Sequence, residues 1–177
     1  MSPLRRHQRI AELPAERRTG EVFRHAMAAR AMLERAWSAE TAFQGITLTE
    51  DDVVSRGQCG VSSLWLARHF DAQGLDASFT EGKIHLLSGE GDEHVWVEVR
   101  GVADEPLVVD LTSDQYRSVL GASVHMGMYA DSHETIGRYT PERRLSPDTV
   151  PRSKLLARYA ILEQNIARLP RRHRVIS

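Results

Sequence analysis

The sequence predicts an α+β fold in which a helix that carries the only cysteine packs on an antiparallel sheet. Two observations predict it. Apolar residues recur at helical spacing in the first part of the chain, and short apolar runs broken by glycine follow in the middle. At 177 residues and 41% hydrophobic content, we expect a single domain over 1–177. Its core is expected at about 19–116, followed by a C-terminal extension at about 117–177 that ends in a helix.

Three helices are expected, at 21–37, about 60–73 and 152–168. Thr19 is the predicted N-cap of the first helix, and the arginine-rich segment 2–18 before it is predicted to be a loose arm or a short helix. Gly74 is predicted to end the second helix. The segment 113–151 has weak periodicity and receives no assignment.

Four short strands are expected, at 76–80, 83–88, 94–100 and 107–112. Glycine-containing turns at Gly82 and at 88–92 are predicted to separate the first three. Alternation places His94 on the polar face of the third strand, with the valines between its polar residues on the core face. On the fourth strand, Asp110 likewise lies on the face opposite Leu107, Val109 and Leu111.

A hairpin between these last two strands brings His94 and Asp110 together. If 101–105 closes the hairpin, any register that keeps the apolar faces together puts both residues on one side of the sheet. Their Cβ atoms then lie about 5 to 8 Å apart. A carboxylate at that distance accepts the imidazole N–H, selects its tautomer and raises its basicity.

Cys59 follows a glycine break and stands immediately before the second predicted helix, at its N-terminus. The unpaired N–H groups and positive dipole end of a helix N-terminus favour thiolate over thiol. Cys59, His94 and Asp110 therefore supply nucleophile, base and orienting carboxylate in that order. The pattern does not place Cys59 against His94, because that depends on how the helix docks on the sheet. The alternative is a small buried thiol and an ordinary polar strand histidine.

Three neighbouring residues have two candidate roles each. The Gln58 side chain either donates to an oxyanion beside the backbone N–H of Cys59 or caps its loop. Trp96 either lines the substrate site or packs on the first helix. Gln115 either binds substrate or braces Asp110.

His85 is the rival candidate for the base, but no carboxylate occupies a matching strand position. A zinc site built from Cys59, His85 and His94 lacks a closely spaced ligand pair such as Cys-x-x-Cys. We therefore expect neither a metal nor another cofactor.

Charge and apolar content limit the kinds of partner and the cellular location that we expect. A net charge of -1 argues against a nucleic-acid or anionic-membrane partner. The N-terminus does not resemble a signal peptide, no apolar run is long enough to span a bilayer, and a single cysteine cannot form an intrachain disulfide. These features predict a cytoplasmic protein, in which the thiol stays reduced.

Four motifs are similar to those of a known family: Trp37-Ser38-x-Glu40-Thr41, Gly57-Gln58-Cys59-x-Val61-Ser62, His94-x-Trp96 and Asp110-Leu111-Thr112-x-x-Gln115-Tyr116. Over about 36–116 the chain resembles the small bacterial proteins typified by YunG, within the transglutaminase-like branch of the papain-type cysteine enzymes. The resemblance implies a papain-like core. It also implies a thioester acyl-enzyme, formed from an amide, ester or thioester and released to water or an amine. The narrower family supports a site more than a substrate.

The sequence thus predicts a cysteine-dependent hydrolase that acts on a small-molecule or peptide acyl substrate, with amide hydrolysis first. One alternative is acyl transfer to an amine, as in transglutaminases. Another is a non-catalytic binding or accessory protein with a papain-like shell, whose arginine-rich ends dock a partner. The acyl group, its acceptor and the oligomeric state stay open.

Overall fold

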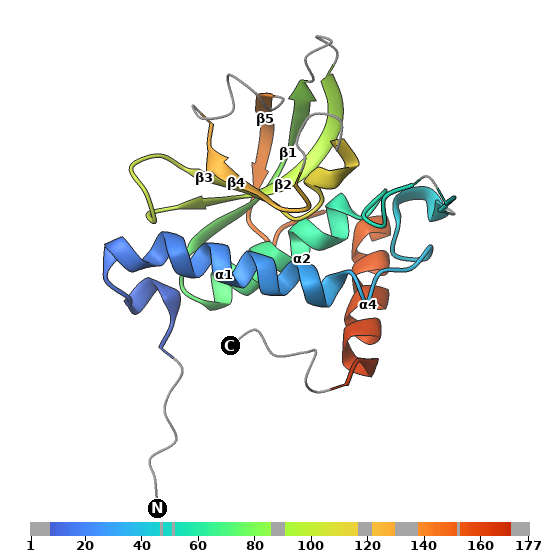
Figure 1. Cartoon of the computed structure of the whole chain (residues 1–177), viewed down its shortest axis with the longest axis horizontal. Helices are drawn as coiled ribbons and strands as arrows, with labels where there is room; N and C mark the ends of the chain where they lie inside the picture. The colour runs from blue at the N-terminus through green and yellow to red at the C-terminus, as the bar shows by residue number, and fades with distance from the viewer. Residues whose placement is uncertain are drawn as a thin grey trace, which may run out of the picture.

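A five-stranded antiparallel sheet lies on helices α1 and α2 in the computed structural model of the chain, with α4 at one end of the helical layer (Figure 1). The structure describes residues 8–46, 48–50, 52–85, 91–116, 122–129, 138–151 and 153–170. Within these ranges the helices are α1 (Ala15–Leu33), α2 (Cys59–Ala72) and α4 (Ser153–Arg168). The strands are β1 (Asp76–His85), β2 (Gly91–Arg100), β3 (Leu107–Asp110), β4 (His125–Met128) and β5 (Arg138–Leu145), in the order β4-β3-β2-β1-β5. The predicted α+β class is confirmed.

Helix α1 starts earlier than predicted. It follows Pro14, which lacks an N–H and suits a helix start, whereas Thr19 lies inside the helix and donates to the Val102 carbonyl at 2.9 Å. The N-cap prediction for Thr19 is therefore wrong. The segment before the helix is not loose where it is described, because Ile10 of the turn η1 (Ile10–Glu12) is only 2% exposed in the main core. Residues 1–7 lie outside the described part.

Strand β1 is one strand where two were predicted, so the turn expected at Gly82 is wrong. A Cβ atom on Gly82 would lie 2.2 Å from the Thr140 carbonyl oxygen and 2.6 Å from Cη2 of Trp96. This glycine serves close approach between strands rather than a turn. Gly74, by contrast, follows α2 with φ +78, as predicted for a residue that ends a helix. Of the turn predicted at 88–92, residues 88–90 lie outside the described residues, and Gly91 already belongs to β2.

The two faces of the sheet carry different side chains, as the alternation predicted. β2 pairs with β3 in the register Val97↔Val109 and Val99↔Leu107, and these residues join the main core with the helices. The opposite face holds a second, smaller cluster around the fully buried Trp96. The predicted face parity is therefore confirmed.

The segment without an assignment supplies both edges of the sheet. β5 pairs with β1, and β4 pairs with β3. Leu155 and Leu162 of α4 also enter the main core. The core thus extends on both sides of the 19–116 expected from periodicity, because strand pairing joins segments that carry little pattern of their own.

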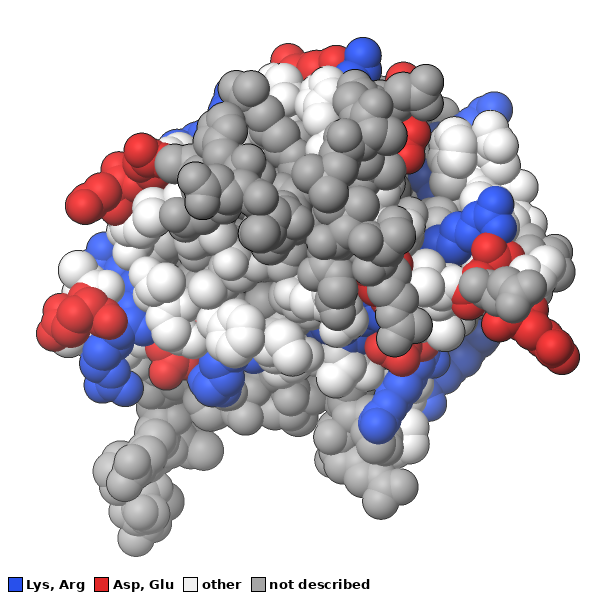
Figure 2. All heavy atoms as spheres, turned by 45° about the horizontal axis from the view of Figure 1, so that its top comes forward, with Lys and Arg blue, Asp and Glu red and all other residues white. Residues whose placement is uncertain are grey.

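Charged side chains of both signs are mixed around the sheet side of the molecule (Figure 2). This distribution agrees with the net charge of -1. Among the helices in the described ranges, none combines the length and apolar character that crossing a membrane requires.

Candidate active site

His94 and Asp110 form the predicted contact. His94 Nε2 lies 2.8 Å from Asp110 Oδ2, and the two side chains are 1% and 0% exposed. Asp110 accepts further hydrogen bonds from the Thr112 backbone N–H at 2.8 Å, the Thr112 hydroxyl at 3.0 Å and the Tyr139 hydroxyl at 2.9 Å. Burial raises the pKa of Asp110, but the positive charge and hydrogen bond of His94 outweigh it and lower that pKa. Asp110 is therefore an ionised, firmly oriented acceptor.

The surroundings of His94 favour its charged form. Burial lowers the pKa of His94, whereas the charge of Asp110, its hydrogen bond and the Cys59 thiol raise it, with a net rise to about 10. Nε2 is bound to Asp110, while Nδ1 is buried and has no hydrogen bond of ordinary geometry within the described residues. Nδ1 is thus the ring nitrogen left for the thiol.

Cys59 is the first residue of α2 and is partly exposed. Gly57 has φ +74 in the preceding turn, which favours glycine, and a Cβ there would lie 3.1 Å from the backbone nitrogen of Phe43. The backbone N–H of Cys59 has no acceptor within the helix, since it belongs to the first turn.

Cys59 and His94 open into one groove of about 580 Å³ between the strands and the start of α4. Docking of α2 has therefore brought together the two residues that the sequence pattern left apart. The groove is lined by Phe43, Cys59, Gly60, Phe79, Glu81, Gly82, Glu93, His94, Val95, Glu142, Pro151, Ser153, Lys154, Leu155 and Arg158.

Two aromatic rings pack against the imidazole of His94. Tyr116 meets His94 edge-on at 5.0 Å between ring centres, and Trp96 stacks on it at 6.4 Å. The Trp96 ring is fully buried, lies on the sheet face away from the helices, and donates to the Tyr129 hydroxyl at 3.0 Å. Packing on the first helix is therefore wrong for Trp96, and its ring is not part of the groove wall.

The Gln58 side chain braces the turn that begins at Ser38. Its amide donates to the Ser38 carbonyl at 3.0 Å, and its oxygen accepts from the Thr41 hydroxyl at 2.9 Å. Gln58 is 2% exposed and lines a separate cavity of about 310 Å³. These contacts favour the loop-capping alternative over direct use of this side chain at an oxyanion. The backbone N–H of Cys59 remains the available donor.

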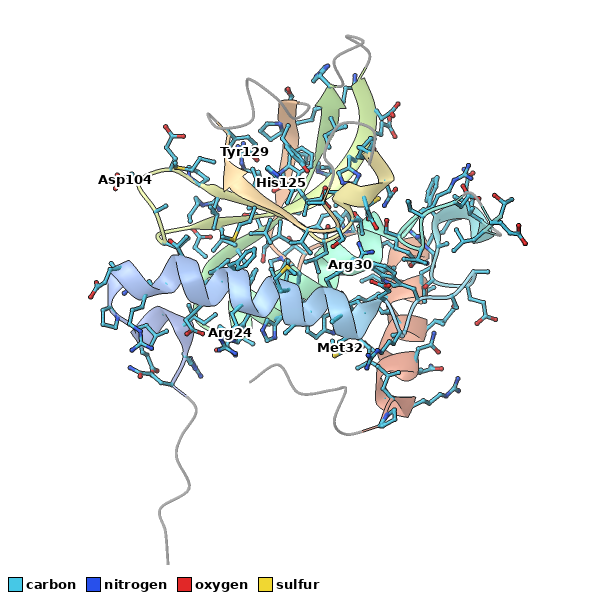
Figure 3. The ribbon with its side chains drawn as sticks, in the orientation of Figure 1. Arg24, Arg30, Met32, Asp104, His125 and Tyr129 are labelled. Atoms are coloured by element: carbon cyan, nitrogen blue, oxygen red, sulfur yellow. The ribbon has the colours of Figure 1, made fainter. Side chains whose placement is uncertain are left out.

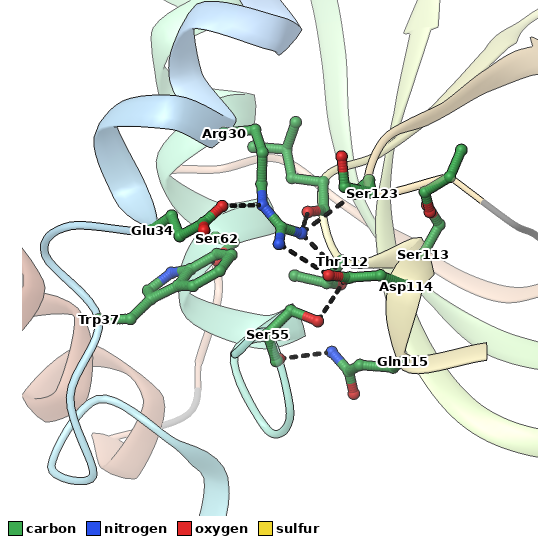
Figure 4. A network of polar contacts seen from close by, with 12 residues as sticks. Arg30, Glu34, Trp37, Ser55, Ser62, Thr112, Ser113, Asp114, Gln115 and Ser123 are labelled. Carbon is green, nitrogen blue, oxygen red and sulfur yellow. Dashed lines mark hydrogen bonds and ion pairs between the residues drawn. The ribbon is translucent and has the colours of Figure 1, made fainter. Parts of the chain in front are cut away.

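A buried arginine joins the loop before Cys59 to the segment that follows Asp110 (Figure 4). Arg30 reaches from α1 toward the sheet (Figure 3) and binds both carboxylate oxygens of Asp114, at 2.9 and 2.7 Å, and the Leu111 carbonyl at 2.6 Å. Ser55, in the loop before Cys59, donates to the same carboxylate. The turn η3 (Ser113–Tyr116), which presents a ring to His94, is thereby tied to the loop that presents the thiol.

Gln115 belongs to this network rather than to the groove. Its amide donates to the Ser55 carbonyl at 2.8 Å, so it braces the loop before Cys59, and among the described residues it neither bonds to Asp110 nor lines the groove. The predicted roles in binding substrate and in bracing Asp110 therefore find no support in its position.

Three residues of the site escaped sequence reasoning. Arg30 lies four residues after Ala26 and three before Leu33, so its place on the buried face of α1 was a readable signal. Arg158 lies at the edge of the apolar stripe of α4, and Tyr139 is the second residue of a charged strand without alternation. For these two the sequence carried no comparable signal.

The rival sites are not assembled. His85, at the end of β1, is not part of the groove wall and packs beside Gly91. No cluster of three or more potential metal ligands occurs in the part of the chain that the structure describes. Comparisons of the chain with models of protein families, with curated proteins and with solved structures give no significant match.

Proposed function

We propose that this protein is a cysteine-dependent acyl hydrolase that acts on an amide, ester or thioester through a thioester acyl-enzyme, with a papain-like arrangement of helix and sheet. One observation carries the proposal. His94 is held by Asp110 through one ring nitrogen, while its other nitrogen is left for Cys59 at the wall of an open groove. A His–Asp pair with a purely structural role needs neither an adjoining thiol nor a solvent-accessible groove.

The acylation step uses the charged state that the site favours. The Cys59 thiolate attacks the carbonyl carbon of the substrate, and the carbonyl oxygen takes up the negative charge beside the N–H groups that open α2. The His94 imidazolium then protonates the leaving group as the bond to the carbonyl carbon breaks. A thioester on Sγ and a neutral imidazole remain.

Deacylation reverses the proton transfers. Neutral His94 takes a proton from water, whose oxygen attacks the thioester carbonyl, and Sγ leaves as thiolate. Asp110 stays ionised throughout and keeps the ring in the tautomer that directs Nδ1 to the groove.

Thiol alkylation as a function of pH tests the proposal. Fluorescent iodoacetamide should label the wild type at pH about 5.5 at a rate within about threefold of its rate at pH about 8, because an ion pair already supplies thiolate. In His94→Ala the labelling rate should rise about tenfold per pH unit over this range, as for an ordinary thiol.

His85→Ala is the matched control, since it removes a strand histidine outside the groove wall. It should behave as the wild type does. If wild type and His94→Ala both rise alike toward alkaline pH, the thiol is not activated, and a non-catalytic binding protein becomes the better account.

A further inference from the structure

Arg158 lies half-buried on the helix side of the groove that contains Cys59. One N–H of its guanidinium donates to the Thr41 carbonyl at 3.3 Å, and the group lies over the Phe43 ring at 5.5 Å. Among the described residues no carboxylate forms an ion pair with it. A guanidinium presents a planar fork of N–H donors suited to a carboxylate. Within the described ranges, the bond to Thr41 is the one hydrogen bond of this guanidinium, so its other N–H groups are left for a ligand.

The guanidinium lies beside the nucleophile. A Cβ atom added to Gly60, the residue after Cys59, would lie 3.7 Å from Arg158 Nη2. Burial lowers the pKa of Arg158, and the charge of Cys59 opposes that change, which is an effect of proximity. A group bound to Arg158 would therefore lie next to a carbonyl under attack by Sγ.

The charges of the groove are divided between its two sides. The strand side carries Glu81, Glu93 and Glu142, from β1, β2 and β5, and the helix side carries Lys154 and Arg158. A negative group in the groove is repelled by the strand side and attracted by the helix side. Any anionic part of a substrate is thus directed to α4.

We propose that Arg158 forms a carboxylate subsite, so that the substrates are acyl compounds with a carboxylate within a few bonds of the scissile carbonyl. N-acyl amino acids and the C-terminal peptide bond of short peptides belong to this class. The inference rests on the proposed function, because it places the substrate relative to Cys59. A bidentate, half-buried pair with Arg158 would hold the carbonyl close to the sulfur.

Two alkylating reagents that differ only in charge test this subsite. In both, Sγ displaces iodide from the CH₂ carbon, but iodoacetate carries a carboxylate where iodoacetamide carries a neutral amide. The measured quantity is the ratio of the iodoacetate rate to the iodoacetamide rate at Cys59. This ratio should fall about tenfold in Arg158→Met, as expected for loss of a charge-assisted pair.

Arg168→Met is the matched control, because it removes the same charge from an exposed position on the same helix. Its ratio should stay within about twofold of wild type, since an exposed charge away from the groove is screened by salt. An unchanged ratio in Arg158→Met, with labelling at mildly acidic pH intact, overturns the subsite and leaves the proposed hydrolase standing. If acidic labelling is absent from the wild type, the hydrolase fails, and the ratio measured at alkaline pH still decides the subsite.

A second measurement needs no variant and so does not depend on Arg158→Met folding. N-acetylglycine places a carboxylate close to an amide carbonyl, and N-acetylglycinamide is its neutral counterpart. The acid should slow labelling of the wild type by iodoacetamide at concentrations at which the amide has no effect. Equal effects of the two compounds would contradict a carboxylate subsite.

Discussion

Replacing Asp110 by asparagine removes the charge that keeps His94 protonated. Asp110 receives only donors, from His94, Thr112 and Tyr139, so an NH₂ group at either oxygen position meets a donor. Without the carboxylate, burial is the largest remaining influence on His94, so its pKa should fall from the value of about 10. We expect Asp110→Asn to lose labelling of Cys59 at mildly acidic pH.

The same substitution should destabilise the fold. Removing one partner of a fully buried charge pair costs about 3–5 kcal/mol. For a chain of this size each kcal/mol lowers the melting temperature by about 2–4 °C, so the melting temperature should fall by about 6–20 °C at neutral pH. Thermal unfolding followed by circular dichroism measures this. The control is Asp104→Asn, which removes a carboxylate from an exposed loop and should shift the melting temperature by less than about 2 °C.

The pH dependence supplies an independent check with a definite sign. Because the folded-state pKa of His94 is raised, its contribution to stability is fully present below about pH 6.5 and is lost as pH rises through about 10. The difference in melting temperature between wild type and Asp110→Asn should therefore narrow as pH rises from 7 to above 10. A difference that is negligible at pH 7, or that grows toward pH 10, refutes the assignment of a charged His94–Asp110 pair.

Three further substitutions, one of them with its own control, test the packing and the buried charges of the fold. Gly82→Ala should lower the free energy of unfolding in denaturant by about 1–3 kcal/mol or more, because its Cβ would overlap a β5 carbonyl and the Trp96 indole. Gly20→Ala is the control: a Cβ there has nothing within 4 Å, so this variant should raise the free energy of unfolding by about 0.5–1 kcal/mol. Arg30→Met should lower it by about 3–5 kcal/mol by leaving a buried carboxylate unpaired, and a loss below about 1 kcal/mol would contradict that account. Burial and the neighbouring His25 lower the pKa of His69 to about 4, so the wild type should lose stability as pH falls from about 6.5 through about 4. In His69→Gln this loss of stability should be smaller. An equal loss in the two proteins would refute the assignment.

The contact between His94 and Asp110 was predictable because it follows from local rules. Alternation assigns each side chain to a face of its strand, and a short hairpin leaves few registers that bury the valines. The start of α2, predicted one residue after Cys59, and its end before Gly74 were likewise readable, since helical spacing and a glycine stop are properties of neighbouring residues.

Misassignments arose where a distant segment overrides the local signal. A turn was predicted at Gly82, but this residue continues β1, because the Trp96 ring and the β5 backbone occupy the space that a side chain at this position would fill. Thr19 looked like a cap, but its hydroxyl binds a carbonyl beyond the end of β2. In both cases the partner lies far along the sequence, so no short window contains the cause.

By itself the sequence determined the α+β class, the face parity of the strands and the pairing of imidazole with carboxylate, because neighbouring residues decide helical and strand periodicity. Only the tertiary structure decided that the thiol shares a groove with His94, and that Tyr139 and Arg158 join the site from β5 and α4. The physical reason is that docking of a helix and pairing of an edge strand depend on how the whole core packs, and packing joins segments whose own sequences do not specify one another.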